Sequence, residues 1–265
     1  MPFAAVNGLQ LYFERAGSGE RLLFISGTGG DLRNKPNQFD GPFPKAFDMI
    51  SYDQRGLGRS DKPDVPYSMA QYADDAAALI ESQGWDRAHV VGVSFGGMVA
   101  QELALRHPQR VSRLVLACTS PGGAGGASFP FHEIEHLKGE ERARYLTPIS
   151  DIRRTDEWAA QNPEAYARLI ALGAADPYAD EPGHAAGAHR QLEARALHDT
   201  WERLAQIAAP TLVAGGRHDG IARPETLERL AGRIPGAGLA FFEGGHLFMI
   251  QDRAAVPAMI DFLKG

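Results

Sequence analysis

The five residues at positions 92–96, Gly-Val-Ser-Phe-Gly, fit the pattern G-x-S-x-G and join two stretches of different periodicity. Residues 88–91 form an apolar run typical of a buried strand, and residues 98–107 have helical spacing. A serine between a strand and a helix lies on a sharp turn that only small flanking residues allow. The segment therefore constrains the fold to a sheet in which this strand leads directly into a helix, with the Ser94 hydroxyl at the strand's end.

Apolar runs and helical segments alternate along most of the chain. Continuous apolar strands separated by amphipathic helices predict an α/β fold, with a mostly parallel central sheet and helices on both faces. Residues 3–15, with Asn-Gly at positions 7–8, predict a hairpin before the first of these runs. The expected strands are residues 22–25, 47–52, 89–93, 114–117, 211–214 and 239–242, and the expected helices are residues 69–82, 98–107, 225–234 and 254–263.

The alternation stops near Pro121 and resumes at residues 209–211. The stretch between opens with a glycine-rich segment and contains helical patterns but no convincing strand. We therefore expect a core domain formed by residues 1–120 and 209–265, and a helical cap, or lid, formed by residues 121–208 over the carboxyl edge of the sheet. The helical patterns in the cap cover residues 140–145, 157–173 and 188–207.

A nucleophilic serine needs a base, and the base needs an acid that orients it. His246 follows Gly-Gly after an apolar strand, so it lies on a loop at the carboxyl end of that strand, where α/β sheets carry their chemistry. Asp219 follows another strand and stands between Ser94 and His246 in chain order. The simpler alternatives are an exposed loop histidine and an aspartate that forms a turn or caps a helix. We expect Ser94 as nucleophile, His246 as base and Asp219 as acid.

An acyl-transfer reaction also needs N–H donors for the developing oxyanion. The N–H of Phe95 opens the helix after Ser94, and the loop at residues 26–30 is rich in glycine, which permits close backbone approach. We expect the N–H groups of Thr28 and Phe95 to form this oxyanion hole, with Gly27 beside the substrate. The alternative for the loop is a flexible turn with no role in catalysis.

The substrate pocket is expected to involve the insertion, where aromatic side chains either line a pocket above Ser94 or form the insertion's own core. Four cationic or titratable side chains there either bind a substrate carboxylate or are simply solvated. The pocket candidates are Phe129, Phe131, His132 and Trp158, with Leu247 next to the base; the carboxylate candidates are His132, His189, Arg190 and His198.

Charge and composition exclude several classes of protein. The chain of 265 residues has 27 basic and 33 acidic residues, a net charge of -6, and no basic run, so we expect neither nucleic acid nor an anionic membrane surface as a partner. The first residues lack a basic segment followed by a long apolar stretch, and the expected location is the cytoplasm. The one cysteine, Cys118, falls in an apolar run and is expected to be a buried strand residue. The insertion leaves room for a homodimer contact, although no apolar stripe requires one.

Together these residues resemble the α/β-hydrolase fold family along nearly the whole chain. Residues 52–60, Tyr-Asp-Gln-Arg-Gly-Leu-Gly-Arg-Ser, look like the family's turn after its fourth strand, and the order serine, acid, histidine matches. The chain most resembles small capped serine hydrolases, which include 3-oxoadipate enol-lactonases, cofactor-free haloperoxidase or perhydrolase relatives and short-chain esterases. Residues 96–104 look most like the lactonases. One departure is Ser26-Gly27, where many relatives have His-Gly.

This resemblance implies a hydrolase that cleaves a small carboxylic ester or lactone through an acyl-enzyme on Ser94, with no metal or organic cofactor. A serine nucleophile, in place of an aspartate, argues against haloalkane dehalogenase or epoxide hydrolase chemistry. Two alternatives remain: C–C bond hydrolysis or perhydrolysis on the same three residues, and a small-molecule receptor that turns over slowly or not at all.

Overall fold

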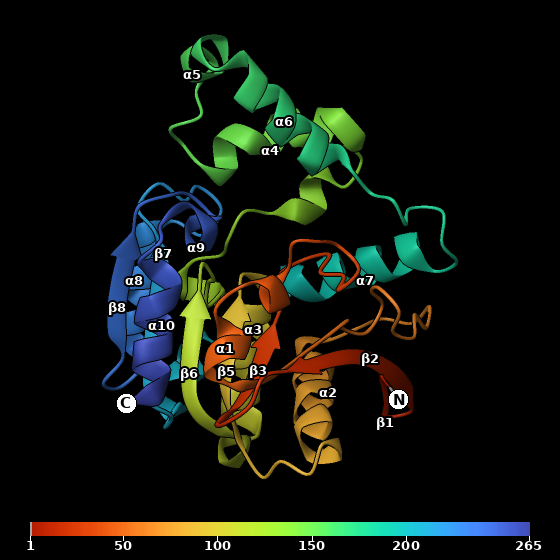
Figure 1. Ribbon diagram of the computed structural model, residues 1–265, viewed down its shortest axis with the longest axis vertical. Coiled ribbons are helices and arrows are strands. Elements are labelled where there is room, and N and C mark those ends of the chain that lie inside the picture. Colours follow the sequence, from red (N-terminus) through yellow and green to blue (C-terminus); the bar gives the residue numbers. More distant parts are fainter. Residues whose placement is uncertain (1) are drawn as a thin grey trace.

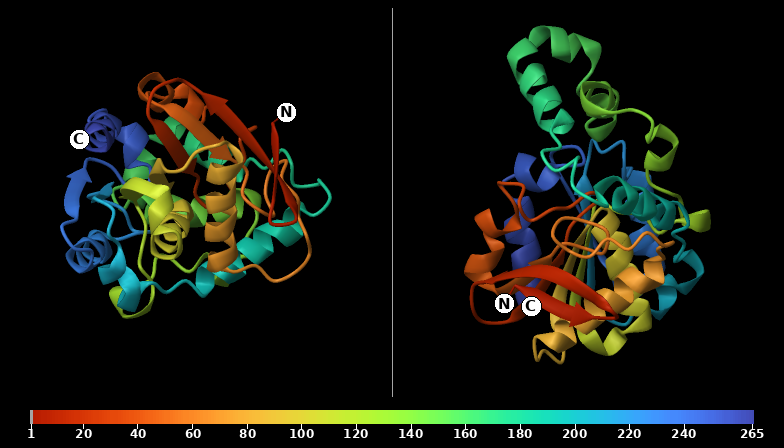
Figure 2. Two further views of the ribbon diagram at one scale, coloured as in Figure 1. Left: turned by 90° about the horizontal axis from the view of Figure 1, so that it is seen from below. Right: turned by 90° about the vertical axis from the view of Figure 1, so that its right-hand side faces the viewer.

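The computed structural model describes residues 2–265, and its centre is one eight-stranded sheet with the order β1-β2-β4-β3-β5-β6-β7-β8. Helices lie on both sides of this sheet (Figures 1 and 2). The strands are β1 Phe3–Val6, β2 Leu9–Ala16, β3 Arg21–Ile25, β4 Asp48–Tyr52, β5 Ala88–Val93, β6 Val111–Ala117, β7 Thr211–Gly216 and β8 Gly238–Phe242. The helices outside the insertion are α1 Phe43–Ala46, α2 Met69–Ser82, α3 Phe95–Arg106, α8 Pro224–Arg233, α9 Phe248–Gln251 and α10 Ala255–Lys264.

The pairing confirms the mostly parallel α/β sheet. Strands β1 and β2 form the expected antiparallel hairpin, and Asn7 and Gly8 at its turn both have positive φ, 48° and 78°, as a type I′ turn requires. Strand β2 runs antiparallel to β4, and every pairing from β4 to β8 is parallel. Parallel strands place all their carboxyl ends at one edge, so the loops that follow β3, β5, β7 and β8 meet there.

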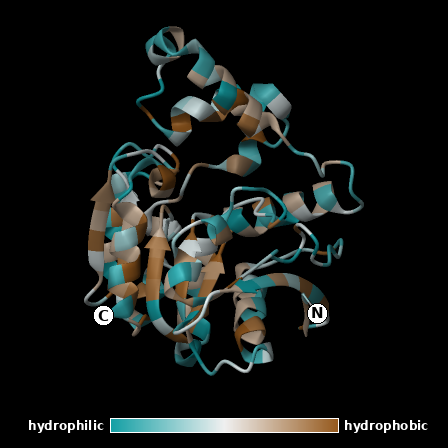
Figure 3. Cartoon of the chain, viewed as in Figure 1, coloured by the Kyte–Doolittle hydropathy of each residue, from teal (hydrophilic) through white to brown (hydrophobic). Residues whose placement is uncertain are grey.

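Strand β6 shows how the core is divided between the two faces of the sheet. Leu114 and Leu116 pack in the apolar layer under α2, α3 and α8, whereas Val115 and Ala117 pack in the layer under α1 and α10. Alternate side chains of a strand point to opposite faces, so a strand covered on both sides must be apolar throughout. The central strands are accordingly mainly hydrophobic (Figure 3).

The insertion between β6 and β7 contains four α-helices: α4 Gly139–Ser150, α5 Asp156–Gln161, α6 Pro163–Ala174 and α7 His184–Ala196. Helices α4 to α6 extend away from the sheet, while α7 lies across the carboxyl ends of the strands (Figure 1). This position of α7 supports the proposal that residues 121–208 form a cap. Within residues 2–265, no helix is both long and apolar enough to cross a membrane.

Two of the helices expected in the insertion are wrong in extent. The helix expected at residues 157–173 is broken at Pro163, which has no N–H to donate and instead starts α6. The helix expected at residues 188–207 ends at Ala196, and a separate 3₁₀ helix follows at Trp201–Gln206. Between them the chain is bonded to the start of the insertion, where Thr200 N–H donates to Pro121 O at 2.8 Å.

Helix α3 begins at Phe95, three residues earlier than expected, and its first turn touches the end of β3. A Cβ added to Gly96 would lie 2.1 Å from Ile25 O, and one added to Gly92 would lie 2.4 Å from Gly96 O. These glycines therefore permit backbone contact between β3, β5 and α3. They do not mark a flexible segment before the helix.

Gly96→Ala should destabilise the fold by about 1–3 kcal/mol, because its methyl group would overlap the Ile25 carbonyl. Gly232 in α8 is the matched control, since a Cβ there meets nothing within 4 Å. Gly232→Ala should instead stabilise the protein by about 0.5–1 kcal/mol, because alanine favours a helix. Urea unfolding of both variants measures the difference. Equal free energies of unfolding would contradict the close-contact explanation.

Candidate active site

Ser94 occupies the turn between β5 and α3 with φ 55° and ψ -115°, a backbone conformation that a residue with a side chain rarely adopts. Hydrogen bonds on both sides of the residue hold it there. Its N–H donates to Ala117 O at 2.8 Å, and its carbonyl accepts from Thr119 Oγ1 at 2.7 Å and from Gly97 N at 2.9 Å. Ser94 is 8% exposed, so its hydroxyl lies at the base of a covered site.

The structure brings Ser94, His246 and Asp219 into one hydrogen-bonded chain. His246 Nε2 lies 3.0 Å from Ser94 Oγ, and His246 Nδ1 lies 2.8 Å from Asp219 Oδ2. With its Nδ1–H donated to the carboxylate, the imidazole offers Nε2 as an acceptor for the serine proton. This arrangement can remove a proton from Ser94 and stabilise the imidazolium that results.

Asp219 both forms a turn and binds the histidine. Its Oδ1 accepts the N–H groups of Ile221 at 2.7 Å and Ala222 at 3.0 Å, while Oδ2 faces His246. The side chain is 2% exposed. The turn fixes the carboxylate in an orientation that faces the imidazole, and the role of Asp219 as catalytic acid stays a prediction.

The end of α4 is hydrogen-bonded to both of the loops that carry these side chains. Ser150 O accepts His246 N–H at 2.6 Å, and Ile149 O accepts Gly220 N–H at 3.1 Å. No sequence pattern pointed to either contact, since each joins segments that are distant in the chain. The insertion is thus tied to the positions of His246 and Asp219.

The side chain of Gln251 forms a hydrogen-bonded relay that also connects the insertion to the loop of His246. Gln251 Oε1 accepts Gly245 N–H at 2.8 Å, and Gln251 Nε2 donates to Asp151 Oδ2 at 3.0 Å. Burial alone would raise the pKa of Asp151, but hydrogen bonds from Arg153 and Gln251 hold that pKa below its ordinary value. Asp151 is therefore a fixed negative group that orients Gln251 toward the loop before His246.

The loop proposed for the oxyanion hole lies against the serine. A Cβ added to Gly27 would be 3.4 Å from Ser94 Cβ. Gln54 Nε2 donates to Ser26 O at 2.9 Å, and Gly29 N–H donates to Gln191 Oε1 of α7 at 2.8 Å. These two glutamines hold the loop although Ser26 stands where many relatives have histidine. The roles of the Thr28 and Phe95 N–H groups stay a prediction.

The side chains proposed to line the substrate pocket differ in burial and lie in different parts of the insertion. Phe131 is buried and Phe129 half-buried, their ring centroids are 5.2 Å apart, and Phe129 N–H donates to Ile221 O beside the Asp219 turn. His132 is exposed. Trp158 is half-buried on α5, at the end of the insertion farthest from the sheet (Figure 1). The apolar cluster around Phe129 joins the insertion to the core and consists of Phe129, Phe131, Ile134, Leu137, Leu146, Ile149, Leu192 and Ile221.

An apolar cavity of about 320 Å³ adjoins His246 on the side of the sheet covered by α1 and α10. Its walls include Phe24, Phe43 and Val93. Leu247, which is 48% exposed, and Ile250, which is 80% exposed, also line it. Large apolar side chains so exposed at a cavity are consistent with a site that receives apolar groups.

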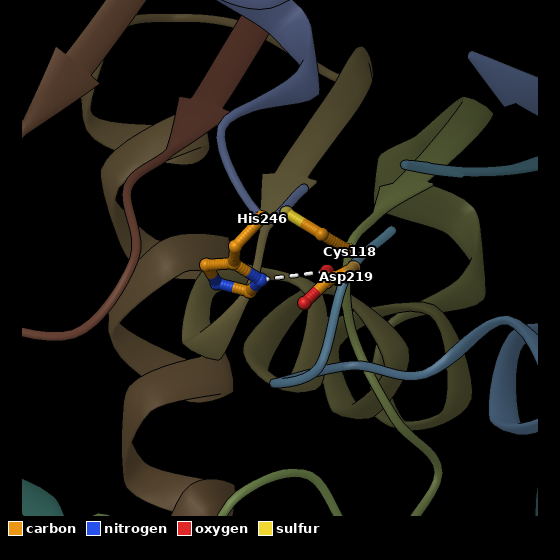
Figure 4. Close-up of side chains that lie close together, drawn as sticks. All are labelled: Cys118, Asp219 and His246. Carbon is orange, nitrogen blue, oxygen red and sulfur yellow. Dashed lines mark hydrogen bonds and ion pairs between the residues drawn. The ribbon is translucent and has the colours of Figure 1, made fainter. Parts of the chain in front are cut away.

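Cys118 lies one residue beyond β6, not within a strand as expected, and has a positive φ of 40°. Its N–H donates to Ala214 O at 2.8 Å, which continues the strand pairing past the point where the backbone turns. The sulfur lies within 4.8 Å of ligand atoms of Asp219 and His246 (Figure 4). Burial, with the Asp219 charge adding to it, raises the pKa of the Cys118 thiol well above its ordinary value. Cys118 is therefore a neutral packing group, as the sequence indicated.

The carboxylate candidates His189 and Arg190 already have acidic partners on the protein. His189 Nδ1 lies 2.9 Å from Glu135, and Arg190 binds Asp64 at 3.0 Å and Glu193 at 2.9 Å. His198 is buried with Nε2 3.2 Å from Ser120 O.

Fold and site together define an α/β protein with a hydrogen-bonded serine, histidine and aspartate at the carboxyl edge of the sheet. The family model described as "alpha/beta hydrolase fold" matches residues 20–252. The chain belongs to this family.

Three known proteins illustrate the similarity. The chain is 30% identical over 262 residues to "Putative carbamate hydrolase RutD" of Variovorax paradoxus (strain S110), covering 96% of each chain. It is 31% identical over 248 residues to a poly(3-hydroxyalkanoate) depolymerase of Ectopseudomonas oleovorans, covering 92% of this chain and 84% of the relative. The crystal structure of the enol-lactonase from Burkholderia xenovorans LB400 matches with a TM-score of 0.80 and 27% identity over 100% of both chains.

Gln251→Leu should loosen the loop that carries His246, because it removes one acceptor and one donor of the relay. Hydrogen exchange followed by mass spectrometry should show amide exchange at residues 245–246 about fivefold faster, as the loss of about 1 kcal/mol of hydrogen bonding implies. Gln83→Leu is the control, since Gln83 binds only the neighbouring Ser82 through its side chain. Unchanged exchange at residues 245–246 would refute the relay.

Proposed function

We propose that the protein is a serine hydrolase that cleaves a small carboxylic ester or lactone through an acyl-enzyme on Ser94. The observation that carries this proposal is the continuous chain of hydrogen bonds from Ser94 Oγ through His246 to the buried carboxylate of Asp219. Membership of the α/β-hydrolase fold family and the similarity to an enol-lactonase support it.

In this proposal His246 Nε2 removes the Ser94 proton as the oxygen attacks the ester carbonyl carbon. The N–H groups of Phe95 and Thr28 stabilise the negative oxygen of the tetrahedral intermediate. His246 then protonates the leaving alcohol, and the C–O bond breaks. Water attacks the acyl-enzyme with His246 again as base, and the carboxylic acid leaves. Asp219 keeps the proton on Nδ1 throughout.

The surroundings favour a small substrate with apolar parts. The apolar cluster around Phe129 and the cavity beside His246 both consist mainly of hydrocarbon side chains. The same three catalytic groups would also serve C–C bond hydrolysis or perhydrolysis. We favour the ester or lactone because simple acyl transfer needs only the nucleophile, the base and the proposed oxyanion donors, and because the apolar surroundings suit an uncharged substrate.

Ser94→Ala should reduce turnover of p-nitrophenyl acetate, p-nitrophenyl butyrate and a panel of small lactones by about 10⁴- to 10⁶-fold, because no other group supplies the nucleophile. Ser112→Ala is a matched control, since that hydroxyl accepts a hydrogen bond from Arg87 at an exposed position. Steady-state rates of the two variants and the wild type decide the question. Residual activity near the wild-type rate in Ser94→Ala would exclude the mechanism, and an inactive wild type would favour the receptor alternative.

Asp219→Asn should lower kcat by about 10⁴-fold while leaving the fold intact. The asparagine oxygen can still accept the Ile221 and Ala222 N–H groups, but its amide would donate to Nδ1 and move the imidazole proton to Nε2. Nε2 then faces Ser94 as a donor and cannot remove its proton. Rates measured beside circular dichroism spectra test this, and a variant with more than a tenth of wild-type kcat would contradict the role of Asp219.

A further inference from the structure

A second, smaller cavity of about 70 Å³ lies where the insertion meets the core. It adjoins the serine turn, because Met98 in its wall follows Ser94 by one turn of α3. Its buried wall also contains Ser120, Arg195 and His198. The exposed residues at its rim are Ala127, His132 and Ala196, so the cavity opens to solvent.

Arg195 in this wall is 7% exposed and has only neutral partners. Its Nη2 donates to Ser128 Oγ at 2.6 Å, and its Nη1 donates weakly to Phe129 O at 3.3 Å. Its Nε has no hydrogen-bond partner. Within residues 2–265, no carboxylate lies within ion-pair distance of it. A buried guanidinium without a negative partner is costly, so its presence requires an explanation.

A second arginine adds to the positive charge. The guanidinium carbons of Arg195 and Arg142 lie 4.4 Å and 5.6 Å from the centre of the Phe131 ring. Burial, with the positive charge of Arg142 adding to it, lowers the pKa of Arg195 to about 10. Arg195 is thus still charged at neutral pH.

The other deeply buried arginine of the fold has an acidic partner. Arg55 is as buried as Arg195, but its guanidinium binds Asp75 through two bonds of 2.6 Å and 2.9 Å. On α7 itself, the half-buried Arg190 has two acidic partners. Arg195 differs from both because it lines an open cavity and has no acidic partner.

His198 supplies a second unpartnered polar atom in the same wall. Its Nε2 faces Ser120 O at 3.2 Å and therefore carries the proton, which leaves the buried Nδ1 as an acceptor without a donor. Burial lowers the pKa of His198 to about 4, so the ring is neutral. The wall thus contains a cation without a counter-ion and a buried acceptor without a donor.

We propose that this cavity is an anion site that binds a compact carboxylate through Arg195. The volume of about 70 Å³ leaves room for this occupant, because about 10–15 Å³ on the same measure already holds one water molecule. A guanidinium matches a carboxylate geometrically as well as in charge. The carboxylate is either a free small acid or the acidic end of an ester substrate.

Formate and acetate, added as sodium salts, test the site without any turnover. At fixed pH and ionic strength balanced with sodium chloride, the wild type and the control Arg190→Gln should show a thermal midpoint that rises with carboxylate concentration. Arg195→Met, which keeps an apolar side chain of similar length, should lose this dependence. An equal rise in all three proteins, or none in the wild type, would overturn the proposal.

A second variant keeps the test decisive if Arg195→Met does not fold. Ala196→Leu leaves the buried charge in place and fills the mouth of the cavity, since Ala196 is exposed at its rim. This variant should fold and lose the stabilisation by carboxylate. Stabilisation equal to that of the wild type would contradict binding in this cavity.

A pair of ester substrates, one with and one without a carboxylate, distinguishes a free acid from the acidic end of a substrate. This part of the test rests on the proposed function. The kcat/KM for p-nitrophenyl hemisuccinate is divided by that for p-nitrophenyl butyrate, which has no carboxylate. If the anion belongs to the substrate, Arg195→Met should lower this ratio at least tenfold and Arg190→Gln should not. An unchanged ratio together with acetate stabilisation supports a free acid as ligand. Inactivity toward both esters would count against the proposed function alone.

Discussion

The close contact between β3, β5 and the first turn of α3 is the constraint on which the site depends. Because Gly92 and Gly96 have no Cβ, α3 can start directly after Ser94 and touch the carbonyl of Ile25. The Ser94 backbone is then held in a conformation that is unfavourable in isolation, and the cost is met by three backbone-directed hydrogen bonds and the buried sheet. The same contact places the loop at residues 26–30, which continues from β3, against the serine.

The insertion takes part in the geometry of the site as well as covering it. Its helix α4 ends in two carbonyls that accept N–H groups from the loops of His246 and Asp219, and α7 holds the loop at residues 26–30 through Gln191. These three loops are therefore bonded to the insertion. A movement of α4 or α7 would alter the alignment of these groups, so access to the site and its chemistry are coupled through hydrogen bonds.

The sequence predicted the sheet and pointed to Ser94, Asp219 and His246 as candidate site residues, because the signals for both are local. Apolar runs define strands, glycines flank Ser94 and His246, and the order of serine, acid and histidine restricts the choice of acid. The break at Pro163 was missed, although a proline inside a helical pattern is a local signal. The relay through Gln251 could not be predicted from the sequence, because it joins α9 to α4 in space. Arg195 was not singled out either, since no pattern tells which arginine of a cap will lack an acidic partner. Such properties follow only from tertiary packing.

The two cavities near Ser94 differ in polarity. The cavity beside His246 is apolar, whereas the one past Met98 is bordered by a buried cation. They lie on opposite sides of the sheet's edge, since one extends the layer under α1 and α10 and the other adjoins α3 and α7. An anion bound at Arg195 would neutralise this cation, so the polarity on the side of α3 depends on whether the smaller cavity is occupied.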